Sequence, residues 1–284
     1  MKTEESALRT IVEMPKWTRP MLRSHRIVLL GSCFAQYMGE RFISEGMDVV
    51  CNPLGAAYNP ESIAIQVQKA LDCAKLTRRN DGTEDASPFD PLPTSIFQYD
   101  GKWRSWWANT LLSDTDKERF CETIHDTFLL LGNAILQADW LFLTLGTNVC
   151  YRLKQSGMTV TNCHKVPSRE FEEVTLSLDA CTDILCNMLK LLTEECPKLR
   201  IVFTVSPYRY RKYGFHGSQL AKATLLLAVD DICKRFPEKA SYFPAYEIML
   251  DELRDYSFYA DDMIHPAPAA ADYIWAKLKA GFSV

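Results

Sequence analysis

Short apolar runs separated by amphipathic stretches recur along the chain. Five of them are candidate strands: RIVLL (26–30), DVVC (48–51), WLFLTL (140–145), RIVFTV (200–205) and SYFPAY (241–246). Runs of this length, rich in β-branched or aromatic residues and bounded by turn residues, are typical of strands buried on both faces of a parallel sheet. The pattern therefore predicts a central parallel sheet of about five strands.

Helical spacing fills several of the intervals between these runs. Apolar residues recur at three- and four-residue steps over 172–193, 217–236 and 268–282. Such periodicity indicates helices that each bury one face. Strands that alternate with helices predict an open α/β sheet in a three-layer α/β/α sandwich, a flavodoxin-like architecture.

One stretch, residues 76–115, departs from this alternation. It holds three prolines, two glycines and three tryptophans, and its periodicity is weak. A segment this long without strong elements is usually functional, disordered or a lid. We expect a single domain over residues 1–284, in which 76–115 is an irregular insertion that covers one end of the sheet.

Composition and charge narrow the classes of partner. A hydrophobic content of 47% can fill a sizeable core, and a net charge of −4 offers no basic footprint for nucleic acid or a membrane surface. The N-terminus lacks the apolar run of a signal peptide, and no run approaches the ~20 residues of a membrane span. The expected location is the cytoplasm, and the sequence does not predict the oligomeric state.

The ten cysteines lie scattered inside apolar segments rather than in a disulfide framework. Most are expected to be small buried hydrophobic residues. The sequence has no C-x-x-C pair and no histidine pair at helical spacing, so it predicts no metal site.

Polar residues follow several of the predicted strands. Ligands of an open parallel sheet bind outside the carboxyl ends of its strands. The loops at this edge carry five residues that could form one site: Ser32, Gly55, Asn148, Asp262 and His265. We expect these loops to open on the same edge of the sheet.

A serine hydroxyl becomes a nucleophile when an imidazole takes its proton and a third group orients that imidazole. His265 and Asp262, three residues apart in a turn, could supply the base and the orienting carboxylate for Ser32. The tetrahedral intermediate also needs hydrogen-bond donors where its oxyanion forms. The backbone N–H groups of Ser32 and Gly55 and the side-chain amide of Asn148 are the candidates.

Plainer roles exist for the same residues. Ser32 lies where a helix would begin, and a serine there commonly caps the helix. Cys33, one position into that helix, is expected to pack inward. Gly55 could serve a turn with positive φ, and Asn148 could cap the end of a strand.

Four further residues could contact a substrate. Trp106 and Trp107 could stack on a sugar ring or line an acyl pocket, or could hold the insertion against the sheet. Arg209, after the fourth strand, could bind an anionic group. His164 could contact the substrate or replace His265 as base, or could hold a turn.

The pentapeptide Gly31-Ser32-Cys33-Phe34-Ala35 resembles the motif that names the GSCFA family, which is similar to the SGNH (GDSL-type) hydrolases. The resemblance extends over nearly the whole chain through NPLG (52–55), TLGT (144–147), NCHK (162–165), VSPYR (205–209) and the stretch 242–266. It implies a three-layer α/β/α fold and a nucleophile early in the chain. It also implies an oxyanion hole from a glycine and an asparagine, and a late Asp-x-x-His pair; these roles fall on Ser32, Gly55, Asn148, Asp262 and His265.

The chain also departs from the SGNH pattern. SGNH members usually read Gly-Asp-Ser with the nucleophile in the third position, whereas Ser32 directly follows Gly31. Val149 stands where their third sequence block usually has an aspartate.

The combined expectation is a cytoplasmic serine hydrolase that cleaves an ester, such as an acyl or acetyl group on a carbohydrate, through an acyl-enzyme on Ser32. An O-acyltransferase would use the same site, with an acceptor hydroxyl in place of water. A noncatalytic protein that binds a glycan or a metabolite is the alternative from another class. None of the three requires a metal or an organic cofactor.

Overall fold

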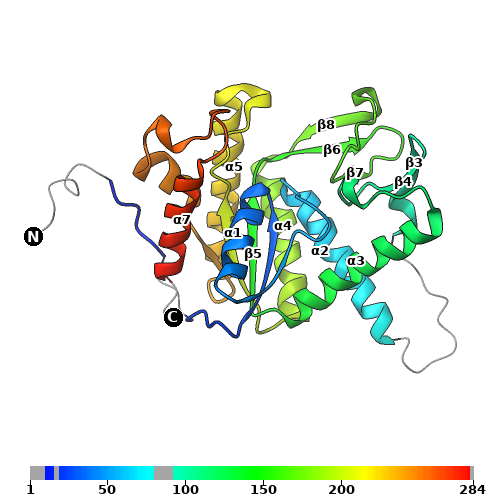
Figure 1. Ribbon diagram of the computed structural model, residues 1–284, viewed down its shortest axis with the longest axis horizontal. Coiled ribbons are helices and arrows are strands. Elements are labelled where there is room, and N and C mark those ends of the chain that lie inside the picture. The colour runs from blue at the N-terminus through cyan, green and yellow to red at the C-terminus, as the bar shows by residue number, and fades with distance from the viewer. Residues whose placement is uncertain (1–9, 16–18, 80–91, 282–284) are drawn as a thin grey trace, which may run out of the picture.

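A parallel sheet of five strands forms the centre of the molecule (Figure 1), in the order β2–β1–β5–β9–β10. The computed structural model describes residues 10–15, 19–79 and 92–281. The strands are β1 (Arg26–Gly31), β2 (Asp48–Cys51), β5 (Trp140–Leu145), β9 (Arg200–Val205) and β10 (Ala240–Tyr242). This order is flavodoxin-like and reverses between β1 and β5, so the loops after these two strands flank the point where ligands bind in such sheets. The predicted five-stranded parallel sheet is confirmed, but the run predicted as a strand over 241–246 is a strand only to Tyr242, and Ala245–Glu247 form a short helix.

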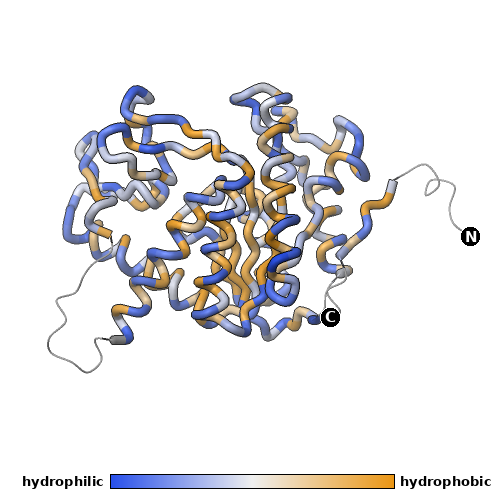
Figure 2. Tube along the Cα trace, turned by 180° about the vertical axis from the view of Figure 1, so that it is seen from behind, coloured by the Kyte–Doolittle hydropathy of each residue, from blue (hydrophilic) through white to orange (hydrophobic). Residues whose placement is uncertain are grey.

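Alternate residues of each strand point to opposite faces of the sheet, and the residues on both faces are apolar. In β1, Val28 and Leu30 belong to one core cluster, and Ile27 and Leu29 belong to the other. The strands at the centre are accordingly among the most hydrophobic parts of the chain (Figure 2).

Helices cover both faces and complete the three layers. One face packs against α1 (Cys33–Ser44), α7 (Pro268–Gly281), the short α6 (Ala245–Glu247) and a π-helical turn (Ile248–Glu252). The other face packs against α2 (Pro60–Arg79), α3 (Lys117–Gln137), α4 (Leu178–Glu195) and α5 (Gly214–Arg235). The helices predicted over 217–236 and 268–282 correspond to α5 and α7.

A three-stranded antiparallel sheet between β5 and α4 was not predicted. Its three strands, in the order β7–β6–β8, are β6 (Val149–Leu153), β7 (Thr159–Val160) and β8 (Phe171–Thr175). The helix predicted over 172–193 is therefore wrong at its start. Residues 171–175 form a strand, and Ser177 then caps α4 by accepting a hydrogen bond from the N–H of Ala180 at 3.1 Å.

The predicted insertion 76–115 is more regular than expected in its described part. Residues 76–79 continue α2, and β3 (Ile96–Tyr99) and β4 (Lys102–Ser105) form an antiparallel hairpin. Residues 80–91 lie outside the described part of the chain. The hairpin turns at Asp100 and Gly101, both with positive φ, as a two-residue hairpin turn requires.

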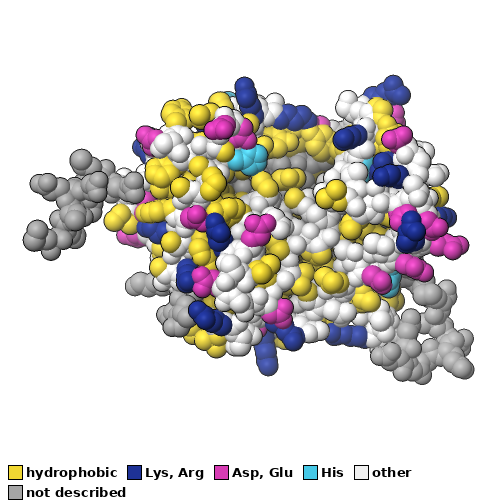
Figure 3. All heavy atoms as spheres, in the orientation of Figure 1, with side chains coloured by type: hydrophobic (Ala, Val, Ile, Leu, Met, Phe, Trp, Pro, Cys, Tyr) yellow, Lys and Arg dark blue, Asp and Glu magenta, His cyan; other side chains and the backbone are white. Residues whose placement is uncertain are grey.

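Charged side chains of both signs are interspersed over the face of the molecule seen in Figure 3. This distribution agrees with 32 basic and 36 acidic residues in the chain. No large patch of one sign stands out on that face.

Candidate active site

A glycine directs the first strand into the candidate site. Gly31 ends β1 with a φ of 136°, a conformation that residues with side chains rarely adopt. A Cβ atom at this position would lie 2.2 Å from the carbonyl oxygen of Thr144 on β5. Because glycine has no Cβ, the chain can turn against β5 and begin α1 two residues later.

Ser32 is turned into the protein, where it is 1% exposed. Its Oγ accepts a hydrogen bond from the backbone N–H of Phe34 at 3.3 Å and so caps α1. The same hydroxyl donates to Oγ of Ser206, in the loop after β9, at 3.1 Å. The hydroxyl of Ser32 is thus engaged in two buried contacts, as in the helix-cap alternative.

A pocket of about 430 Å³ lies at the carboxyl edge of the parallel sheet. The loops that follow β1, β5 and β9 bound it on one side, and the beginning of the three-stranded antiparallel sheet bounds it on the other. Its lining residues are Cys33, Tyr58, Asn59, Thr147, Val149, Tyr151, Val160, Thr161, Tyr208, Tyr210 and His265. The described lining contains no Asp, Glu, Lys or Arg. The pocket brings His265 together with Cys33, and Ser32 is not among the lining residues.

Cys33 is the exposed member of the ten cysteines, all of which lie in the described residues. The expectation that it packs inward is therefore wrong, whereas the other nine are buried or partly buried as expected. Although the residue as a whole is exposed, partial desolvation by the surrounding atoms raises the pKa of the Cys33 thiol, while the backbone N–H groups of Cys33 and Phe34 and the charge of Lys222 act in the opposite direction. A raised pKa means that a neighbouring base must remove the thiol proton at neutral pH.

His265 and Asp262 form the predicted hydrogen-bonded pair. Nδ1–H of His265 donates to Asp262 Oδ2 at 2.5 Å, and the backbone N–H groups of His265 and Ile264 donate to Oδ1 at 2.9 and 2.8 Å. These bonds, first of all the one from the imidazole, lower the pKa of the Asp262 carboxyl to about 2. Since Nδ1 carries the proton, Nε2 keeps its lone pair and can act as a base.

Two residues after β9 support the loop of His265. The backbone N–H of Arg209 donates to the carbonyl of Ile264 at 3.0 Å, and its Nη1 donates to the carbonyl of Met263 at 3.2 Å. The ring centroid of Tyr208 lies 4.6 Å from that of His265. Arg209 lines a different cavity, of about 450 Å³, so it holds the loop and does not face the candidate active site.

The three predicted oxyanion donors are engaged elsewhere. Each donates to a backbone carbonyl: the N–H of Ser32 to Thr144 at 3.1 Å, the N–H of Gly55 to Asn52 at 2.8 Å, and Nδ2 of Asn148 to Leu176 at 2.7 Å. None of these donors belongs to a residue that lines the pocket. The geometry therefore does not bring them to Cys33.

Asn59 is a pocket residue that the sequence reasoning missed. Its Oδ1 accepts a hydrogen bond from the N–H of Ser62 at 2.8 Å and thereby caps α2. Because this bond identifies Oδ1 as the acceptor, Nδ2 is the amide atom that can donate a hydrogen bond into the pocket. Asparagine before Pro60, at the start of a helix, is a capping signal that could have been read from the sequence.

The two tryptophans predicted as substrate contacts are buried in the core. The ring of Trp106 stacks on that of Phe97 with centroids 3.5 Å apart. Trp107 donates from Nε1 to the carbonyl of Thr159 at 3.2 Å. Both side chains attach the hairpin region to the rest of the molecule, and neither lines the pocket.

His164 is likewise buried and fully bonded. Its Nε2–H donates to the carbonyl of Ser105 at 2.8 Å, so its Nδ1 accepts from the hydroxyl of Thr110 at 2.9 Å. Burial lowers the pKa of His164 to about 4, and the charge of Arg104 contributes. His164 therefore holds a turn, and it does not line the pocket of His265.

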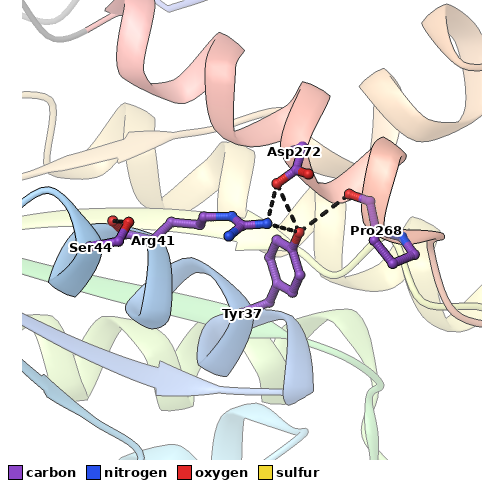
Figure 4. A network of polar contacts seen from close by, with 5 residues as sticks. All are labelled: Tyr37, Arg41, Ser44, Pro268 and Asp272. Carbon is purple, nitrogen blue, oxygen red and sulfur yellow. Dashed lines mark hydrogen bonds and ion pairs between the residues drawn. The ribbon is translucent and has the colours of Figure 1, made fainter.

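A polar network links the helices on which Cys33 and His265 depend (Figure 4). The hydroxyl of Tyr37 on α1 donates to Oδ1 of Asp272 on α7 at 2.9 Å, and the guanidinium group of Arg41 contacts both. Cys33 begins α1, and α7 begins three residues after His265. The network therefore joins α1, which begins at Cys33, to α7, which follows His265 closely.

Neither a metal centre nor a membrane span is evident in the described residues. No group of three or more His, Cys, Asp or Glu side chains there is arranged to hold a metal ion. No helix of that part of the chain combines the length and apolar character that crossing a membrane requires.

Sequence comparison provides the family. The GSCFA family model matches residues 26–278. The chain belongs to the GSCFA family. No curated protein matches it.

Two solved structures are similar to this GSCFA protein. A carbohydrate esterase family 2 enzyme with a carbohydrate-binding domain, from Corynascus thermopiles (Myceliophthora fergusii), is 14% identical with a TM-score of 0.42, over 93% of this chain and 68% of that one. The acetyl xylan esterase Est2A of the rumen bacterium Butyrivibrio proteoclasticus is 12% identical with a TM-score of 0.44, over 94% and 67%.

Each residue of the GSCFA motif has a separate physical role in the structure. Gly31 allows the turn, Ser32 caps α1, and Cys33 faces the pocket. Phe34 and Ala35 are buried in the core between α1 and the sheet. The third position of the motif, Cys33, is therefore the one that reaches the pocket.

Proposed function

We propose that this GSCFA protein is a hydrolase of ester bonds whose nucleophile is the thiol of Cys33. His265 is the general base, and Asp262 orients its imidazole. The backbone N–H of Cys33 and Nδ2 of Asn59 stabilise the oxyanion. The proposal keeps the base and the reaction class predicted from the sequence. It replaces the nucleophile, and it replaces the three predicted oxyanion donors with the backbone N–H of Cys33 and Nδ2 of Asn59.

The reaction proceeds in two halves. His265 Nε2 takes the proton from Sγ of Cys33, and the thiolate attacks the acyl carbon to form a tetrahedral intermediate. Its collapse breaks the ester C–O bond, the alcohol leaves with the proton from His265, and the acyl group remains on Cys33 as a thioester. His265 then deprotonates a water molecule, which attacks the thioester and releases the carboxylic acid and the free thiol.

One observation supports this assignment above all others: Cys33 and His265 line the same pocket, while the hydroxyl of Ser32 is engaged with Phe34 and Ser206. A nucleophile must reach both its base and its substrate. Cys33 meets the second requirement through its exposure, and it lines the same pocket as the base.

The lining of the pocket suggests the kind of ester. Tyrosine side chains and small polar groups line it, and the ionisable carboxylates, lysines and arginines of the described chain lie elsewhere. Such a surface suits an uncharged, hydroxyl-bearing alcohol portion, for which an acylated carbohydrate is one example. The described part of the 76–115 stretch does not line the pocket. It therefore does not cover the pocket against water, which is the feature that would favour acyl transfer to an acceptor hydroxyl over hydrolysis.

The test is acylation by p-nitrophenyl acetate followed by acid quenching and fragmentation mass spectrometry. The acetyl group is expected on Cys33 as a hydroxylamine-sensitive thioester. Cys33→Ala should abolish both the adduct and turnover, and His265→Ala should slow acylation by about 10²- to 10⁴-fold. Ser32→Ala should remain reactive, with a loss of about 1 kcal/mol in unfolding free energy because a helix cap is removed.

Ser177→Ala is the matched control, since Ser177 caps α4 with the same type of bond away from the pocket. It should cost similar stability and leave acylation unchanged. An adduct on Ser32 that persists in Cys33→Ala would instead identify the serine hydrolase predicted from the sequence. Folded protein without an adduct on either residue would favour the noncatalytic binding protein.

A further inference from the structure

Four polar residues join the three-stranded antiparallel sheet to the segment after β9, and these two parts of the chain bound the pocket on different sides. Tyr151 on β6 and Glu173 on β8 belong to the antiparallel sheet, and Lys212 and Tyr213 belong to a 3₁₀ turn that follows β9. The ammonium group of Lys212 contacts the carboxylate of Glu173 and the hydroxyl of Tyr151. We call this set of four residues the clasp.

The hydroxyl of Tyr151 is fully used within the clasp. It donates to Oε2 of Glu173 at 2.8 Å and accepts from Lys212. Because its one proton goes to the carboxylate, the hydroxyl of Tyr213, which lies 3.2 Å away, is the donor in their contact. Tyr151 therefore has no hydrogen bond left for a substrate, and it contributes its ring to the lining of the pocket.

The clasp is more than a single exposed ion pair. The side chains of Lys212 and Glu173 are 49% and 37% exposed, and one pair in such a position contributes little by itself. Nζ of Lys212 also lies 4.8 and 5.1 Å from the ring centroids of Tyr151 and Tyr213, distances at which a cation is attracted to an aromatic face. One ammonium group is thus held by three side chains on two segments.

The clasp is continuous with residues that line the pocket. Tyr151 lines it from the antiparallel sheet, and Tyr210 lines it from the segment after β9. The ring of Tyr210 packs on that of Tyr213 with centroids 5.4 Å apart. Tyr210 is followed by Tyr208 at 6.2 Å and Tyr208 by His265 at 4.6 Å, again between ring centroids. A row of packed rings therefore runs from the clasp to the proposed base.

The antiparallel sheet is fastened differently on its other side. There Arg152 pairs with Glu61 of α2 at 3.1 Å. Between strands β6–β8 and residues 206–213 of the described chain, every hydrogen bond and ion pair belongs to the clasp. Loss of the clasp would therefore free the side of the sheet that faces the segment after β9, while the side at α2 stays attached.

We infer that the clasp determines the specificity of this site: it holds the two sides of the pocket together and so limits the size of the ester that reaches Cys33. The inference rests on the proposed function, because it takes this pocket as the substrate site. The preferred substrates are then esters with a compact alcohol portion. Lys212 and Glu173 do not line the pocket, so they act through the rings of Tyr151 and Tyr210.

The first test compares two acetyl esters whose alcohol portions differ by one fused ring, phenyl acetate and 2-naphthyl acetate. Lys212→Met keeps the aliphatic stem and removes the charge, so the two sides of the pocket can separate. The ratio of kcat/KM for the naphthyl ester to that for the phenyl ester should rise about fivefold, chiefly through a lower KM for the naphthyl ester. A folded Lys212→Met protein with an unchanged ratio would overturn the inference.

Lys234→Met is the matched control. Lys234 is also an exposed lysine paired with a carboxylate, that of Asp230 at 2.6 Å, but both residues lie on α5 four positions apart. Its replacement removes an ion pair without separating two segments, so the ratio should stay unchanged. Equal rises in both variants would show a general loosening of the molecule and would overturn the specific role of the clasp.

Glu173→Gln alters the clasp from the antiparallel sheet. Glutamine keeps an acceptor for Tyr151 but loses the ion pair with Lys212, so the ratio should rise by a smaller factor than in Lys212→Met. The double variant should match Lys212→Met alone, because both substitutions remove the same interaction. Additive effects would mean that the two residues act separately and would contradict a shared clasp.

A second measurement needs no substrate. Cys33 is exposed and lines the pocket, so its alkylation reports access to the pocket. The rates with N-methylmaleimide and with the bulkier N-cyclohexylmaleimide are compared by peptide mass spectrometry in the full chain. Lys212→Met should raise the relative rate of the bulkier reagent about fivefold, and Lys234→Met should not. An unchanged relative rate in Lys212→Met would overturn the inference.

The two measurements separate the inference from the proposed function. If Cys33→Ala keeps full esterase activity, the proposed nucleophile is wrong, whereas the maleimide rates still show whether the clasp limits access to the pocket. If Cys33 is acylated and neither ratio changes in Lys212→Met, the inference about the clasp fails alone.

Discussion

Asp262 determines which nitrogen of His265 carries the proton. Its Oδ2 accepts from Nδ1–H at 2.5 Å, which leaves Nε2 as the basic nitrogen. In Asp262→Asn the amide can present its N–H₂ group to Nδ1 and favour the other tautomer. We expect turnover of p-nitrophenyl acetate to fall by about 10²- to 10⁴-fold, since the equivalent change in a Ser-His-Asp triad costs about 10⁴.

Asp261 offers a matched control because it is the same residue type one position earlier, and no bond of it to His265 is observed in the described chain. Asp261→Asn should leave turnover within about twofold of the unaltered protein, by the small effect expected of an exposed surface change. Equal losses in the two variants would instead indicate that the whole loop had moved.

Residue type alone could predict only part of this site. The Asp262–His265 pair was predicted because both partners lie on one turn, three residues apart. Ser32 and Cys33 were harder to distinguish, because adjacent positions at a helix start point in different directions and only the structure shows which enters the pocket. The position of the Asn148 amide could not be predicted either, because it bonds the carbonyl of Leu176, which directly follows a strand that was not predicted.

At the scale of elements, His164 fastens the β3–β4 hairpin to the turn at residues 162–165. It bonds the carbonyl of Ser105 at the end of β4 and the hydroxyl of Thr110. Its pKa of about 4 lies below that of an unfolded histidine. Between these two pKa values the unfolded chain binds a proton at this histidine that the native state does not bind. The stability that His164 contributes is therefore fully present above pH ~6.5 and is lost as the pH drops toward 4.

Because of His164, we expect the unfolding free energy to fall by up to about 3 kcal/mol as the pH drops from ~6.5 to about 4. The measurement is denaturant unfolding as a function of pH for the unaltered protein, His164→Gln and His125→Gln. Glutamine can keep one hydrogen bond but does not titrate, so His164→Gln should show a shallower decline. His125 is exposed on α3, and its replacement should leave the slope unchanged; an unaltered slope in His164→Gln would contradict the assignment.

Element prediction succeeded where strands are apolar runs and failed where strands are mostly polar. The five strands of the main sheet are apolar runs, so the pattern identified all of them, including the partly buried β2. The end of the last strand was placed too late, because the apolar character continues past Tyr242 into α6. Strand β8 exposes most of its residues, and Val174 happens to continue the helical spacing of α4. The Asp100-Gly101 pair was a hairpin signal, but the surrounding prolines and glycines led to the prediction of an irregular segment.

At the scale of the whole molecule, the layer that carries α1 and α7 depends on one buried carboxylate. Glu252, in the π-helical turn, is 3% exposed. Its Oε1 accepts from the hydroxyl of Tyr273 at 2.5 Å and pairs with Lys277 at 2.6 Å, both on α7, and Oε2 accepts from the N–H of Val12 at 3.4 Å. The N-terminal segment at Val12, the π-helical turn and α7 therefore meet at Glu252.

Glu45 provides a surface counterpart, because it pairs with Lys279 of the same helix at 2.6 Å but on the exterior. Removing one partner of a buried ion pair costs about 3–5 kcal/mol, whereas an exposed pair contributes about 0–1 kcal/mol. We therefore expect Glu252→Ala to lower the unfolding free energy several-fold more than Glu45→Ala in urea titrations. Because α7 follows His265 closely, Glu252→Ala should also slow turnover of p-nitrophenyl acetate, and Glu45→Ala should not. Equal stability losses in the two variants would mean that Glu252 is solvated and does not fasten α7 to this layer.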